Sequence, residues 1–355
     1  MQQFGVNALH PSAPEFLSAA ALFSAPIDLE AAIGRLNSRW KVGAAPQWAE
    51  IPASEASGAE DGSAGETPGA ANQPDTAAPA PTALMHFTIG TTQVMLSEVH
   101  EPLQPERGIL PAHSYYVAIT LFTPAPPDPE LDPDLAATLA SKDPSKYTPE
   151  EAAAAAARST AAAVARRRCS VTAHILLTQL AEALLCDPAA VGLYRAELGV
   201  VQPPAMLAEL APLLEQGQVP LPLWVNIRVQ PETKQPEPKQ VQPEPPTASS
   251  DAPESAAPAP TATPSRDAAT HTPLTLGRTL GMPLFGHLDI EIVHSEHSLE
   301  EVYAELANVV AYVVTSDAYL LPGQTLSFAA DASAARAVTE ALSELDGTPV
   351  IRIMY

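Results

Sequence analysis

The stretch Gly281–Val314, GMPLFGHLDIEIVHSEHSLEEVYAELANVVAYVV, decides the fold of this chain. From Leu288 to Ile292, apolar residues alternate with polar ones, which is the period of a β-strand with one face in the core and one in water. Ser298 then precedes Glu301 at the spacing of a capping box, in which both side chains accept hydrogen bonds from free N–H groups at a helix start. The stretch therefore predicts one half-buried strand that runs into one capped helix.

The predicted helix carries an apolar stripe that is wide enough to pack on a sheet. The stripe consists of Leu299, Val302, Tyr303, Leu306, Val309, Val310 and Val313. Strand, helix and hairpin patterns recur in outline at both ends of the chain. We therefore predict an α+β fold with a mixed, largely antiparallel sheet that is backed by helices.

Further elements are predicted by local patterns along the rest of the chain. Alternation and turn residues predict strands, and apolar residues at helical spacing behind a capping residue predict helices. The predicted strands are 16–24, 84–89, 93–99, 115–121, 190–200, 221–229, 274–279, 324–328 and 350–354, and the predicted helices follow Asp28 and span 159–185 and 206–214. The alanine-rich segment Ala332–Leu345 fits either a helix or an extended segment.

Three segments rich in Pro, Ala, Ser, Thr and acidic residues interrupt these patterns, at about 49–82, 124–157 and 230–272. They contain hardly any large apolar side chains and cannot build a core, so we predict disordered inserts. We expect an N-terminal α+β region over 1–229 and a C-terminal α+β region over 273–355. The two regions are expected to pack together, with the strands on either side of the third insert paired.

The run from Gly281 through LLPGQTLSF at Leu320–Phe328 resembles a bacterial family known as domain of unknown function 4261. Upstream, the runs SAAALFSAPIDLEAAIGRLNSRW, HSYYVAITLF and LPLWVNIRV resemble the N-terminal portion of the family more loosely. The resemblance implies an α+β fold. It also implies extended segments after the glycine turn, in the region of Ala332–Leu345. It assigns no catalytic residue.

Charge and targeting signals restrict the class of partner. The chain has 355 residues and a formal net charge of −23, most of it in the predicted inserts. Such a balance opposes binding to nucleic acid and to anionic lipid, because phosphate binding needs clustered Lys and Arg. The N-terminus lacks a secretory pattern, and the apolar helix Val302–Val314 is too short to cross a bilayer. Cys169 and Cys186 are too far apart on one predicted helix to pair. We therefore expect a cytoplasmic protein.

The sharpest chemical hypothesis is a metal site. His287, Asp289 and Glu291 would share one strand face, with His294 and His297 just beyond. However, any half-buried strand needs polar residues on its solvent-exposed face, and this explanation of the polar residues needs no metal. We therefore expect no resident metal, and these five residues stay weak candidates.

Other chemistries find less support. Cys169 and Cys186 have no base at a recognisable spacing, and His174 lies beside an apolar stripe, so buried structural roles are expected. The basic run Arg166–Arg168 is expected to be a solvated part of a helix. Gly277, Gly281 and Gly286 do not match the dinucleotide-binding spacing, so no cofactor is predicted.

We expect a non-catalytic protein that binds another protein, because no catalytic groups converge in the sequence. Two alternatives are a metal-dependent hydrolase that uses the His287–His297 neighbourhood and a small-molecule binding domain.

Overall fold

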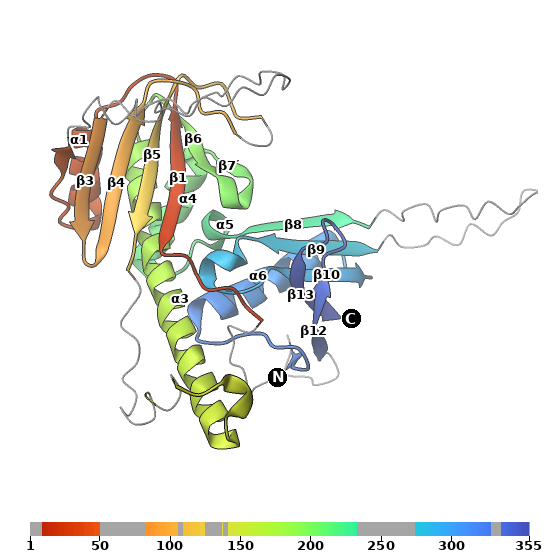
Figure 1. The fold of residues 1–355 in the computed structure, drawn as a ribbon. Coiled ribbons are helices and arrows are strands. Elements are labelled where there is room, and N and C mark those ends of the chain that lie inside the picture. The colour runs from red at the N-terminus through yellow and green to blue at the C-terminus, as the bar shows by residue number, and fades with distance from the viewer. Residues whose placement is uncertain are drawn as a thin grey trace, which may run out of the picture.

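The computed structural model describes residues 9–49, 83–105, 109–124, 137, 141–232, 274–327 and 335–354. The strands of this part of the chain form two largely antiparallel sheets, and helices pack on them (Figure 1). The predicted α+β class is confirmed. The strands divide between two sheets, whereas the sequence patterns suggested one.

The first sheet has seven strands in the order β2-β3-β4-β5-β1-β6-β7, and every neighbouring pair is antiparallel. Helices α1 and α3 cover one of its faces (Figure 1). The strands are β1 (Phe16–Phe23), β2 (Gln47–Ala49), β3 (Ala83–Ile89), β4 (Thr92–Val99), β5 (Tyr115–Phe122), β6 (Ala190–Arg195) and β7 (Val200–Gln202). The predicted hairpin of β3 and β4 is confirmed, with Gly90 at φ 58° in its turn.

The second sheet has six strands in the order β11-β12-β13-β10-β9-β8, and only the pair β10 and β13 is parallel. Its strands are β8 (Asn226–Pro231), β9 (Thr275–Leu280), β10 (Ile290–Ser295), β11 (Thr325–Leu326), β12 (Arg336–Leu342) and β13 (Pro349–Met354). The pairing of β8 with β9 confirms that the strands flanking the third predicted insert are partners. β8 thus belongs to the second sheet, although it begins before residue 229, where the N-terminal region was expected to end.

The helices are α1 (Leu29–Trp40), α3 (Pro149–Leu185), α4 (Pro204–Leu210), α5 (Leu221–Trp224) and α6 (Leu299–Thr315), with short 3₁₀ turns η4 (Pro144–Lys146), η5 (Ala196–Leu198), η6 (Ala211–Gln216) and η7 (Met282–Phe285). The predicted caps are confirmed: Asp28 accepts from the N–H of Ala31, and Ser298 forms a capping box with Glu301. The predicted apolar stripe of α6 is partly wrong, because two of its residues, Leu299 and Tyr303, are exposed.

α6 packs closely on the second sheet because Gly277 faces it from β9. A Cβ atom at Gly277 would lie 2.6 Å from Val302 and 2.8 Å from Leu306, so a larger residue would push the helix away. One continuous cluster of buried side chains joins both sheets and their helices. The two sheets therefore share a core.

Two sequence predictions need correction, and one open alternative is resolved. α3 begins at Pro149 behind a capping box of Thr148 and Glu151, so the end of the predicted insert 124–157 is helical. The predicted strand 221–229 is a helical turn followed by β8, because Pro222 suits the first turn of a helix. Within the segment Ala332–Leu345, residues Arg336–Leu342 form a strand, as the family resemblance implied, and the segment ends in the β12–β13 turn. The predicted inserts 49–82 and 230–272 lie outside the described residues except at their ends.

Candidate functional sites

The five residues proposed for a metal site do not converge. His287, Asp289 and Glu291 lie in three different hydrogen-bond networks, and His294 and His297 each contact other carboxylates. The wet strand face predicted for His287 and Glu291 is wrong, because both side chains are fully buried. The alternation is real, but each face of β10 is covered by a different part of the chain.

The ring of His287 packs at a tilt against the ring of His10, a residue of the segment that leads into β1. Their ring centroids are 4.0 Å apart. His10 Nε2 lies 3.0 Å from the Leu320 carbonyl, and its Nδ1 accepts from the N–H of Leu288. Burial lowers the pKa of His10 to about 4 and holds the pKa of His287 well below its usual value. Both imidazoles are therefore neutral, and they fasten the N-terminal segment to the second sheet.

Asp289 is a structural acceptor at the start of β10. Its carboxylate accepts from the N–H of Met282 at 3.1 Å and from the hydroxyl of Thr279 at 3.2 Å. Burial raises the pKa of Asp289 to about 6, and these hydrogen bonds oppose the shift. The residue thus holds η7 against β9.

Glu291 is at the centre of a charged cluster on the face of the second sheet opposite α6. It accepts from the hydroxyl of Ser343 at 2.6 Å and from Arg352 at 2.8 Å. Arg278 on β9 donates to the hydroxyls of Ser343 and Thr348, both at 2.7 Å. These bonds fasten the β12–β13 turn to the sheet.

Arg278 also pairs with Asp346 in this turn at 2.7 Å, and this pairing lowers the pKa of Asp346 to about 2. The charges of the cluster are matched within the molecule.

His294 lies between two carboxylates at the edge of this cluster. It occupies a β-bulge with φ 55°, and its Nδ1 is 2.8 Å from Glu232 while its Nε2 is 3.5 Å from Glu344. One ligand-type atom from each of the three residues lies within 4.8 Å of the others, so they could hold a divalent cation. Arg352 competes for Glu344 at 3.3 Å. His297 lies apart and pairs with Glu305 at 3.2 Å.

Arg167 ties α3 to the second sheet and was predicted wrongly as a solvated residue. It is 1% exposed and donates to the carbonyls of Phe285, Val313 and Ala318, with its guanidinium 3.8 Å from the ring centroid of Tyr319. The sequence held a signal for this burial. Helical spacing places Arg167, Ser170, His174 and Leu177 on one face of α3, and all four are buried.

His174 is a third buried histidine, and sequence reasoning expected a structural role for it. Burial and the neighbouring Arg195 lower the pKa of His174 to about 3. Its ring packs against Trp224 and Phe285. The sealed position suits a packing role. The buried role expected for Cys186 is wrong, because this residue at the C-terminal end of α3 is exposed, and Cys169 is only partly buried.

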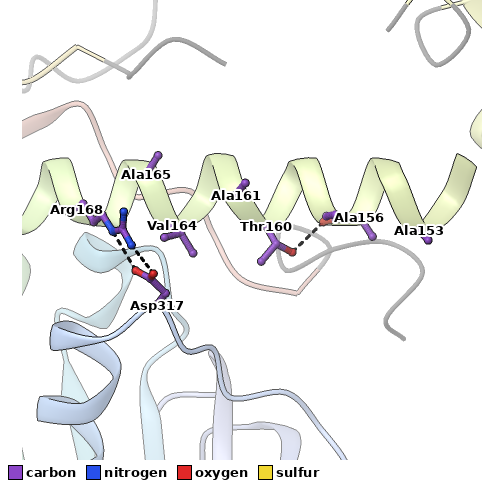
Figure 2. A pocket seen from close by; sticks show the side chains of 9 residues that line it. Ala153, Ala156, Thr160, Ala161, Val164, Ala165, Arg168 and Asp317 are labelled. Carbon is purple, nitrogen blue, oxygen red and sulfur yellow. Dashed lines mark hydrogen bonds and ion pairs between the residues drawn. The ribbon is translucent and has the colours of Figure 1, made fainter. Parts of the chain in front are cut away.

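A groove of about 700 Å³ runs along the N-terminal half of α3 (Figure 2). Small residues line it, among them Ala153, Ala157 and Ala161. Its polar groups already have partners: the Thr160 hydroxyl donates to the Ala156 carbonyl, and the guanidinium of Arg168 pairs with Asp317 (Figure 2). The groove has the volume of a small-molecule site but few groups to orient a ligand.

A further, partly accessible feature is the face of the first sheet opposite α1 and α3. In the part of the chain that the structure describes, no helix covers this face (Figure 1). We call it the open face and define it by three rows of side chains from β3, β4, β5, β1 and β6. The aromatic row is Thr88, Gln93, Phe122 and Phe16, the middle row is His86, Met95, Thr120 and Ser18, and the small row is Leu84, Ser97, Ala118, Ala20 and Tyr194.

None of these thirteen positions is Asp, Glu, Lys or Arg. Phe16 is 56% exposed and Met95 is 38% exposed, and Phe16 stacks on Phe122 with ring centroids 4.8 Å apart. A contiguous face without charged residues resembles the core of a protein interface, where charged residues are depleted. Sequence reasoning missed it because the register that places these residues side by side is set by tertiary pairing.

These features define an α+β protein with one closed, charged sheet face and one open, uncharged sheet face. Residues 278–354 match the family model described as Domain of unknown function (DUF4261). The resemblance seen in the sequence is thereby confirmed for the C-terminal region. No curated protein matches the chain, and no solved structure matches it. Among the described residues, no helix is long and apolar enough to cross a membrane.

Proposed function

We propose that this chain is a non-catalytic bacterial protein that binds another protein through the open face of its first sheet. The observation that carries the proposal is a five-stranded face without a charged side chain, on a chain with a net charge of −23. Exposed Met95 offers apolar area at the centre of this face, and exposed Phe16 offers it at the edge. Ser, Thr and Gln side chains offer hydrogen bonds around them.

The remaining polar clusters favour binding over catalysis. A general acid or base must reach its substrate, whereas His10, His174 and His287 are buried and already have partners. The charged cluster around Glu291 is neutralised by its own arginines.

We also propose a cytoplasmic location, since Cys169 and Cys186 are free thiols. We propose no role in nucleic-acid binding, since the chain is acidic.

The test is partner capture from lysate of the native cell with matched variants of the full chain. Met95→Glu places a charge on the open face, and Met354→Glu is the control, since Met354 lies on β13 and is 40% exposed against 38% for Met95. We expect a partner that wild type and the control retain and that Met95→Glu loses. Equal capture by all three proteins would dismiss the proposal.

A divalent-cation site at Glu232, His294 and Glu344 is the second candidate, and it would support the metal-dependent hydrolase considered above. The supporting observation is the convergence of three ligand-type side chains from separate elements. Titration calorimetry with Zn²⁺ or Mn²⁺ tests it, with His297→Ala as control for His294→Ala. Stoichiometric binding that only His294→Ala abolishes would support this candidate, and an absence of binding to wild type would remove it.

A further inference from the structure

We infer that the partner for the open face is a second copy of this chain, packed face to face about a twofold axis. This inference rests on the proposed function and names its partner. The axis would lie across the strands, along the middle row of the open face. Each strand would then cross over its own symmetry mate, in the way that two sheets pack in a sandwich.

The shape of the open face is complementary to itself under this rotation. Phe122 and Phe16 form a ridge two residues from the middle row, about 7 Å to one side. Ala118 forms a trough two residues to the other side, whereas its cross-strand neighbour Ala20 is buried, at 7% exposure. Rotation about the middle row therefore places Phe122 over Ala118 of the second copy, and this contact is made twice.

Charge favours the same partner. Two copies that each carry −23 repel each other wherever their acidic surfaces meet. The open face is a broad surface on which a second acidic chain can approach without placing like charges in contact. A basic partner would gain nothing from a neutral face, whereas an identical chain requires one.

The size of the face sets the expected strength of the dimer. Five strands and three rows of side chains would bury roughly 900 Å² over both copies, which is below the size of a standard stable interface. The dimer should therefore be weak and depend on concentration, with half-dissociation in the micromolar range or above.

The test measures the mass of the full chain by sedimentation equilibrium over a range of concentrations. We expect wild type and Met354→Glu to shift from monomer to dimer with rising concentration. Met95→Glu should stay monomeric, because the axis places the two Met95 side chains close together. A wild type that stays monomeric throughout, or a dimer that Met95→Glu leaves intact, would overturn the inference.

A swap of ridge and trough tests the symmetry itself. Phe122→Ala removes the ridge and Ala118→Phe fills the trough, so each single variant should dissociate at least tenfold more readily than wild type. The double variant should regain most of the lost affinity, because Phe at position 118 would face Ala at position 122 of the second copy. Circular dichroism verifies that each variant is folded. If the double variant is as weak as the singles, the arrangement is wrong.

If the wild type is monomeric but binds a different protein that Met95→Glu loses, this inference fails while the proposed function stands.

Discussion

The two sheets of this molecule differ in the face that does not pack against helices. Each sheet packs one face against helices. The other face of the second sheet holds Glu291, Arg278 and Arg352, and the β12–β13 turn folds over them. The open face of the first sheet holds no charged residue and has no helix over it in the described part of the chain.

The difference shows that charge on a sheet face does not by itself identify a binding surface. Glu291 is fully buried because its own chain supplies both a counter-charge, Arg352, and a cover. Met95 and Phe16 are exposed although they are apolar, and burying them would be favourable by the hydrophobic effect. Where the molecule closes a face internally, mutations should change stability. Where it leaves a face open, they should change association.

The largest effect is expected for Glu291→Ala. It leaves Arg352 without its buried partner, so the free energy of unfolding should fall by about 4 kcal/mol. Urea denaturation of the full chain measures the loss. Glu300→Ala, on the exposed first turn of α6, is the control and should change stability by less than about 0.5 kcal/mol. Equal effects of the two substitutions would show that the closed face is not held by its charges.

The junction between the sheets should respond almost as strongly. Arg167→Ala removes three hydrogen bonds to carbonyls and leaves a cavity, so we expect a loss of about 3 kcal/mol. Arg168→Ala removes only an exposed pair with Asp317, which is worth about 0.5 kcal/mol. Denaturant unfolding distinguishes the two neighbours. A similar small loss for both would mean that Arg167 does not tie the sheets together.

Acid should weaken the same junction through His10. Its pKa is lowered to about 4, so the fold favours the neutral ring. The stabilisation is therefore complete above about pH 6.5 and is lost as the pH falls from about 6.5 to about 4, by about 3 kcal/mol. Arg167 faces the same ring and adds to the penalty for protonation of His10, and His10 in turn helps to lower the pKa of His287. Asp289 acts in the opposite sense, since its pKa is raised to about 6.

The comparison of wild type with His10→Asn isolates this contribution, because every other titrating group is present in both proteins. Unfolding measured at several pH values should show that the advantage of wild type shrinks as the pH falls from 6.5 to 4. A difference that stays constant over this range would mean that the pKa of His10 is not lowered in the fold.

Local signals predicted much of the fold but little of the candidate sites. The caps at Asp28 and Ser298 and the hairpin around Gly90 depend on neighbours in sequence, so their patterns were sufficient. The burial of Glu291 depends on Arg352, which is 61 residues away. The open face depends on a register between five strands. Sequence patterns carry no direct record of such distant pairings, and residue type alone suggested the wrong environment for Glu291 and Arg167.

The smallest effect on stability, and the largest contrast with Glu291→Ala, is expected for Met95→Glu. Met95 points away from the core, so the new carboxylate stays in water and the free energy of unfolding should change by less than about 0.5 kcal/mol. The same substitution should abolish binding at the open face, because a buried interface would have to desolvate the charge. Urea denaturation and sedimentation on one preparation measure both quantities. A large loss of stability together with unchanged association would reverse the assignment of the two faces, since the first sheet would then be closed by its own chain.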